Sequence, residues 1–217
     1  MNNETTRASA PVQMQEGQMG KWAAWYDLIM ALMTFGRERK LRQDTIGLAQ
    51  IWPGDNILEI GCGTGSLTLA AKAQAGSSGE VVGIDIAPEM VAKALSKAAR
   101  TGADVSFQEG SIEHIPFPDN RFDVVLCSFM IFHMPEEVRE KGFPEIYRVL
   151  RPGGHLFILD AAQSNKPLQP SSGRTHDVRE LAPVLQDNSF TEIEMKKTPF
   201  GFMGTPFWFV RGKADKV

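Results

Sequence analysis

The chain has 217 residues, which is enough for one domain with a complete hydrophobic core. Its 23 basic and 26 acidic side chains nearly balance, and no stripe of Lys and Arg with interleaved aromatic residues marks a nucleic-acid binder. Two cysteines without a CxxC partner indicate neither a disulfide framework nor a zinc site, and no apolar run reaches the roughly 18 residues that span a bilayer.

Residues 1–19 are small and polar and lack the apolar core of a signal peptide, so we expect a flexible arm. Residues 20–217 are expected to form a single domain, which opens with a helical segment over 20–50. In this segment apolar residues such as Trp22 and Tyr26 recur at spacings of three and four, a pattern typical of a helix with one apolar face. We expect this segment to act as a lid over a ligand site.

Residues 37–42 are the most densely basic part of the chain, with four cationic side chains. Such a short run predicts a solvated helix face. Contact with an anionic substrate, or peripheral contact with a membrane surface, is the alternative.

Residues 57–66 predict a strand that runs into a ligand-binding turn. An apolar run ends at Ile60, Gly61, Gly63 and Gly65 follow, and a helix is predicted over 66–75. Glycine permits positive φ and the close approach of a ligand, and this order of elements places the ligand at the helix N-terminus. The next strand, 80–84, leads into Asp85, at a spacing that suits a carboxylate bound to ribose hydroxyls.

Strands and helices continue to alternate, which predicts a parallel sheet covered on both faces. The remaining predicted elements are a helix over 88–99, strands over 104–108 and 122–127, a helix over 135–149 ended by 150–154, a strand over 155–160, a loop over 161–176, a helix over 178–187, and strands over 191–198 and 206–211. A short connection predicts that the last two strands are antiparallel. The expected fold is α/β and Rossmann-like: a doubly wound seven-stranded sheet, mostly parallel with the last strand antiparallel, plus an N-terminal helical lid.

The glycine spacing separates two kinds of nucleotide site. A dinucleotide fingerprint, G-x-G-x-x-G, would need glycine where the chain has Ser66. The observed G-x-G-x-G, with Glu59 two residues before it, resembles the first motif of class I S-adenosylmethionine (SAM)-dependent methyltransferases (methyltransferase domain type 11). Residues 107–119, 122–129 and 146–154 resemble that family's segment after the third strand, its fourth strand and its exit from the following helix.

Within this class the pattern is most similar to the ubiquinone/menaquinone C-methyltransferase group. The pairs Tyr-Asp at 26–27 and Ser-Phe at 128–129 carry that similarity. The chain departs from the family at two places. It has Ser111 where many members have Asp near the adenine, and Met-Ile-Phe-His at 130–133 where the quinone enzymes usually have a Gly-Leu-Arg-Asn turn.

The resemblance implies SAM as the cofactor, S-adenosylhomocysteine as its product, and no metal. The residues expected to contact the cofactor are Tyr26, Glu59, Gly61, Cys62, Gly63, Thr64, Gly65, Asp85, Ile86, Met90, Gly110, Ser111, Ile112, Ser128 and Phe129. His133 lies just past the fourth strand, where an acceptor should bind, and imidazole titrates in the range of a general base. It is the candidate catalytic residue, with a helix-capping histidine as the alternative.

The methyl group of a sulfonium is already activated, so we expect in-line displacement with water excluded. The candidate walls of the acceptor site favour a small apolar or aromatic molecule: Trp22, Trp25, Met30, Phe129, Met130 and Phe132. Two other functions compete with methyl transfer. They are a nicotinamide-dependent oxidoreductase, disfavoured by Ser66 and Glu59, and a non-catalytic SAM-binding protein.

The two cysteines, Cys62 and Cys127, lie inside apolar runs, which fits buried thiols in a reducing cytoplasm. We therefore expect a cytoplasmic protein, monomeric or homodimeric, whose partner is a small-molecule acceptor and not a nucleic acid.

Overall fold

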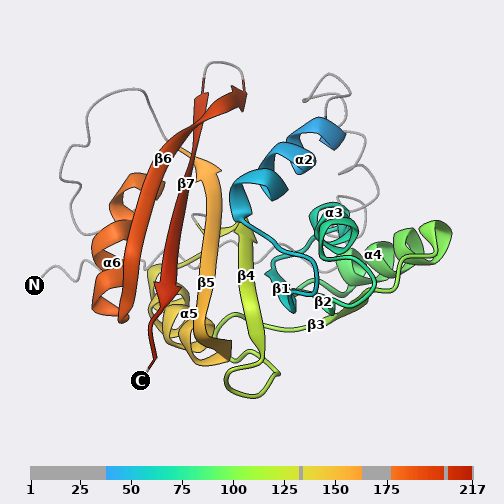
Figure 1. Cartoon of the computed structure of the whole chain (residues 1–217), viewed down its shortest axis with the longest axis horizontal. Coiled ribbons are helices and arrows are strands. Elements are labelled where there is room, and N and C mark those ends of the chain that lie inside the picture. Colours follow the sequence, from blue (N-terminus) through green and yellow to red (C-terminus); the bar gives the residue numbers. More distant parts are fainter. Residues whose placement is uncertain (1–37, 132–133, 163–176, 203–204, 217) are drawn as a thin grey trace, which may run out of the picture.

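The computed structural model describes residues 38–131, 134–162, 177–202 and 205–216. In this part of the chain the helices and strands are α2 (Glu38–Ala49), β1 (Ile57–Ile60), α3 (Ser66–Ala75), β2 (Val81–Asp85), α4 (Pro88–Thr101), β3 (Ser106–Glu109), β4 (Phe122–Ser128), α5 (Glu136–Val149), β5 (Leu150–Ala161), the 3₁₀ turn η2 (Val178–Glu180), α6 (Leu181–Asp187), β6 (Phe190–Phe202) and β7 (Thr205–Ala214). Figure 1 shows their arrangement.

Seven strands form one sheet in the order β3-β2-β1-β4-β5-β7-β6. The first five are parallel to one another, and β7 is antiparallel to both of its neighbours, β5 and β6. The predicted Rossmann-like sheet with its last strand antiparallel is therefore confirmed. The chain leaves β1 toward β2 on one side and later places β4 on the other, so the crevice of a doubly wound sheet opens at the carboxyl ends of β1 and β4.

Alternate side chains of the central strands fill two cores, one on each face of the sheet. On one face Ile60 and Val125 pack with apolar residues of α5 and α6. On the other face Ile57 and Leu126 pack with residues of α2 and α3, and Figure 1 shows the helices divided between the two sides. Because both faces are covered, the central strands read as nearly continuous apolar runs in the sequence.

Most boundaries lie within one or two residues of the predicted ones, and the last three strands differ most. β5 begins at Leu150 and not at residue 155, because Leu150 is fully buried and pairs with Phe122 of β4. β6 runs on to Phe202, four residues into the segment predicted to connect it to β7, and β7 ends at Ala214 and not at residue 211. The helix predicted upstream of α2 lies outside the described residues.

Gly65 of the glycine loop packs closely against residues of β3 and α4. A Cβ at this position would lie 2.6 Å from the Phe107 ring and 2.9 Å from the Cβ of Ala94. Its φ of 77° adds a second reason for glycine, since L side chains rarely adopt that backbone conformation. The loop therefore lies directly on β3 and α4, with no space for a side chain between them.

We expect Gly65→Ala to lower the free energy of unfolding by about 2–4 kcal/mol, because overpacking adds to the backbone strain. Gly102→Ala is the matched control: Gly102 has φ 64° at the end of α4, but an added Cβ there meets no atom within 4 Å. Gly102→Ala should lower the free energy of unfolding only by the backbone strain, about 1–2 kcal/mol. Urea denaturation of both variants tests this, and equal losses would contradict the packing argument.

Candidate functional site

A pocket opens where β1 and β4 end, at the crevice of the sheet. It is lined by Arg42, Glu59, Gly61, Cys62, Gly63, Thr64, Ser66, Leu67, Ser128 and Phe129. Seven of these ten residues are among the positions that the sequence assigns to cofactor contact: Glu59, Gly61, Cys62, Gly63, Thr64, Ser128 and Phe129. The structure thus brings the end of β1, the glycine loop and the end of β4 together around one space.

Gly63 leaves room for a ligand where a side chain would otherwise stand. Its φ is 53°, and an added Cβ would meet no atom within 4 Å, although the neighbouring loop residues line the pocket. Gly61, in contrast, is in contact with a protein side chain: a Cβ there would lie 3.0 Å from Met130. The open position at Gly63 fits a cofactor that lies against the backbone of this loop.

Asp85 ties the end of β2 to the glycine loop. Its Oδ2 accepts a hydrogen bond from the Gly63 amide at 2.8 Å, and its Oδ1 accepts one from the Ala87 amide at 2.9 Å. Each carboxylate oxygen has a second lone pair, so both can still accept a bond from a ligand hydroxyl. Ile86, the next residue, is 75% exposed, and Met90 is half-buried in the first turn of α4.

Glu59 places a carboxyl group inside the pocket wall. It is 3% exposed, and the Thr68 hydroxyl donates a hydrogen bond to its Oε2. Burial raises the pKa of Glu59 to about 7, while the bond from Thr68 and the charge of Arg42 act in the opposite direction. The side chain therefore changes charge close to neutral pH.

Arg42 lines the pocket, although the sequence placed it only in the basic run 37–42 and did not assign it to the cofactor site. Its side chain is 11% exposed, its Nη2 lies 3.6 Å from Glu38, and its buried Nε has no hydrogen-bond partner among the described residues. It lies on the same face of α2 as Thr45 and Ile46, the residues that face the core three and four positions later. That spacing is the sequence signal that separates Arg42 from its solvated basic neighbours.

The segment after β3 is joined to the end of β2 through its backbone, and its predicted contact residues do not line the pocket. The Gly110 amide donates to the Asp85 carbonyl at 3.1 Å, and the Ser111 hydroxyl accepts from the Glu113 amide at 3.2 Å. The Ile112 side chain is 3% exposed and packs beside Gly142 of α5. Of the three predicted contacts here, Ile112 can offer a ligand only its backbone.

The end of β4 supplies a buried hydroxyl and a constrained aromatic ring. The Oγ of Ser128 is buried and has no hydrogen-bond partner among the described residues. Phe129 has φ 55°, its amide donates to the Leu159 carbonyl at 2.9 Å, and its ring meets that of Phe207 edge to face at 4.8 Å between centroids. Positive φ at a phenylalanine costs on the order of 1–3 kcal/mol and is typical of residues fixed at binding sites.

Two of the predicted site residues, Tyr26 and the candidate base His133, lie outside the described residues. Cys62 and Cys127 are buried, and burial raises the pKa of both thiols well above the usual range, so neither is a nucleophile at neutral pH. Within the described ranges no group of three or more His, Cys, Asp or Glu side chains is placed to hold a metal ion. In the same ranges no helix is long and apolar enough to cross a membrane.

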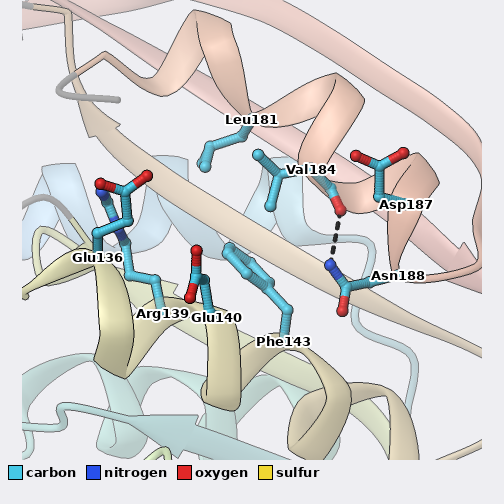
Figure 2. A pocket seen from close by; sticks show the side chains of 8 residues that line it. All are labelled: Glu136, Arg139, Glu140, Phe143, Leu181, Val184, Asp187 and Asn188. Carbon is cyan, nitrogen blue, oxygen red and sulfur yellow. Dashed lines mark hydrogen bonds between the residues drawn. The ribbon is translucent and has the colours of Figure 1, made fainter. Parts of the chain in front are cut away.

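A second pocket lies between α5 and α6, and none of the predicted site residues lines it. Figure 2 shows Phe143 and Val184 at its apolar part, with Glu136, Glu140 and Asp187 among the polar residues around it. It is formed by the helices on the face of the sheet opposite α2 and α3.

Comparison with known proteins shows what the chain is similar to. Residues 57–154 match the model of the methyltransferase domain family. The chain is 40% identical to a demethylmenaquinone methyltransferase of Thermus thermophilus over 135 residues, which are 62% of this chain and 60% of that protein. It is 36% identical to a ubiquinone/menaquinone biosynthesis C-methyltransferase of Yersinia enterocolitica over 157 residues, 71% of this chain and 61% of that protein. Residues 57–154 therefore form a methyltransferase domain.

The chain spans about three fifths of the length of those two relatives. Solved structures share its fold. A SAM-dependent methyltransferase from Aquifex aeolicus superposes with a TM-score of 0.70 at 22% identity, covering 90% of this chain and 98% of that one. The [4+2]-cyclase SpnF superposes with a TM-score of 0.72 at 19% identity, covering 95% and 97%. At such identities the structures support the fold and not a particular reaction.

Glu59 gives the stability of the protein a pH dependence. The folded protein keeps the Glu59 proton up to about pH 7, whereas the unfolded chain loses it above about 4.5. The free energy of unfolding therefore falls as pH rises through this window, by about 3 kcal/mol in total. Glu59→Gln removes the titrating group. From pH 5 to pH 8 the free energy of unfolding of the parent should therefore fall by about 2–3 kcal/mol more than that of the variant. Denaturant titrations at the two pH values measure this difference, and a difference independent of pH would contradict it.

Proposed function

We propose that the protein binds SAM in the pocket between β1 and β4 and transfers its methyl group to a small apolar, aromatic acceptor. The observation that carries the proposal is the pair of opposite charges in the pocket. Arg42 and Glu59 both line it, together with the backbone of the glycine loop. A zwitterionic amino acid needs a cation for its carboxylate and a carboxylate for its ammonium, and this pocket holds one of each.

The Glu59 carboxylate of this pair argues against a dinucleotide. A pyrophosphate on the glycine loop would carry its negative charges to the Glu59 carboxylate, which is buried and cannot be screened by water. An ammonium group in that place has the opposite effect, because it favours ionised Glu59. Binding of SAM should therefore release a proton near pH 7, and affinity should increase with pH through this range.

The described residues offer a candidate partner for each part of SAM. Arg42 would bind the methionine carboxylate, Glu59 the ammonium, and Asp85 the ribose hydroxyls, while Ile86 offers an exposed apolar surface to the base. The open space at Gly63 would admit the chain between the two ends. When bound, SAM supplies an activated methyl group on its sulfonium.

The contribution of the protein to the reaction would be to position the acceptor and exclude water. Good alignment of two bound reactants can supply roughly 7–11 kcal/mol of the barrier reduction. Phe129 lines the pocket and is fixed by Phe207, and Met130 packs on the glycine loop. These apolar groups favour an aromatic ring beside the cofactor, which agrees with the quinone biosynthesis named for the relatives.

Turnover of SAM tests this function directly. The purified protein is incubated with SAM and a panel of quinols, phenols and other aromatic acceptors, and S-adenosylhomocysteine is quantified. Formation that depends on an acceptor supports methyl transfer. SAM binding without product on any acceptor would support a non-catalytic SAM-binding protein, and NAD binding without SAM binding would contradict the proposal.

Arg42→Met should weaken SAM binding about 10- to 100-fold, the loss typical of a charge-assisted hydrogen bond. It should leave the affinity for 5′-methylthioadenosine nearly unchanged, because that nucleoside lacks the amino-acid group. Calorimetric titration with both ligands measures the contrast. Arg39→Met is the control, since Arg39 is an exposed cation in the same helix. Equal weakening of both ligands would show that Arg42 acts through the fold and not through the carboxylate.

A further inference from the structure

Lys97 reaches from α4 to the glycine loop. Its Nζ donates a hydrogen bond to the Thr64 hydroxyl at 3.0 Å and another to the Ser66 hydroxyl at 2.8 Å. Both hydroxyl-bearing residues line the cofactor pocket, and Thr64 is only 2% exposed. Lys97 itself is half-buried and was not among the residues that the sequence assigns to the site.

The same face of α4 supports the loop by packing. Ala94, one turn before Lys97, is fully buried and lies where a Cβ on Gly65 would clash. Val91 and Ala98 on this helix pack with Cys62 of the loop. The loop is therefore fixed by apolar contact at Gly65, by the Asp85 carboxylate at Gly63, and by the Lys97 ammonium at Thr64 and Ser66.

The position of this ammonium has an electrostatic consequence. Ser66 is the first residue of α3, where the unsatisfied amides carry partial positive charge, and a cation there is unfavourable for the helix. Gly65, the N-cap, provides no side chain to offset it. An anion bound at this end of the pocket would be attracted by the helix terminus and by the ammonium together.

An ammonium also orients the groups that it binds. It is a donor only, so the oxygens of Thr64 and Ser66 must both accept its hydrogen bonds. Their hydroxyl protons therefore point away from Lys97. Such a hydroxyl is a donor toward other partners, and a carboxylate is an acceptor only.

We propose that Lys97 is a positioning residue that holds Thr64 and Ser66 of the glycine loop in the conformation that binds the anionic end of the cofactor. This inference rests on the proposed SAM site. It predicts that the loss of the ammonium affects the amino-acid end of SAM more than the nucleoside end. It also predicts that, without ligand, the glycine loop of a variant lacking this ammonium opens more often than the loop of the parent protein.

Calorimetry compares the parent with Lys97→Met, which keeps the length of the side chain without its charge. We expect the Kd for SAM to rise about tenfold, and the Kd for 5′-methylthioadenosine to rise less than about threefold. Lys97→Arg should restore most of the SAM affinity. Arg100→Met, which removes an exposed cation from the same helix, should change neither Kd. An unchanged SAM affinity in Lys97→Met would overturn the inference, as would an equal loss for both ligands.

Hydrogen exchange of the free protein gives a readout that needs no ligand. In Lys97→Met the amides of residues 61–66 should exchange at least several-fold faster, while those of β1 should keep their rates. Unchanged rates in the loop, or equal acceleration in β1, would overturn the role of Lys97 in holding the loop. If the parent protein does not bind SAM, the proposed function fails and this exchange measurement alone decides the part played by Lys97.

Discussion

The site depends on one carboxylate that joins the ends of two strands. Asp85 ends β2, and its oxygens bind the amides of Gly63 and Ala87, so the glycine loop, β2 and the start of α4 form one hydrogen-bonded unit. The loop contains three glycines with positive φ, and because glycine has wide conformational freedom, these contacts select one conformation of the loop. The packing of Gly65 on Phe107 and the hydrogen bond from Lys97 to Thr64 also hold the glycine loop in place.

The pocket combines charges that are costly to bury. Glu59 is almost fully enclosed, and its carboxyl group is half-ionised near neutral pH because of that enclosure. Arg42 is nearly as enclosed and lies in the same pocket. A ligand with both an ammonium and a carboxylate would give each of them a partner. Burial of these charged groups lowers the free energy of unfolding of the ligand-free protein. A ligand that pairs with both groups would recover part of that free energy on binding, so the pocket favours such a ligand over one with a single charge.

Some of this organisation could be predicted from the sequence, and some could not. Helix α3 begins and ends at the predicted residues, 66 and 75, because the glycine motif and Gly76 mark its two ends locally. The parallel sheet followed from the alternation of strands and helices. The spacing of Arg42 to the buried Thr45 and Ile46 is visible in the sequence, but its place in the pocket is not, because that depends on which residues lie opposite α2. Lys97 was missed for the same reason, since its partners Thr64 and Ser66 lie on another element. The early start of β5 at Leu150 has the same origin, since it results from pairing with Phe122.

The strand order also constrains how the protein can assemble. β6 precedes β7 in the chain but reaches the sheet only through it, because β7 lies between β5 and β6. β6 therefore cannot join the sheet before β7 has been synthesised, although it precedes β7 in the chain. Phe207 belongs to β7 and holds Phe129 at the pocket. A folding intermediate that contains β1 to β5 would already have the glycine loop, but its Phe129 would lack the contact with Phe207. The part of the pocket beside Phe129 would therefore be completed late in folding.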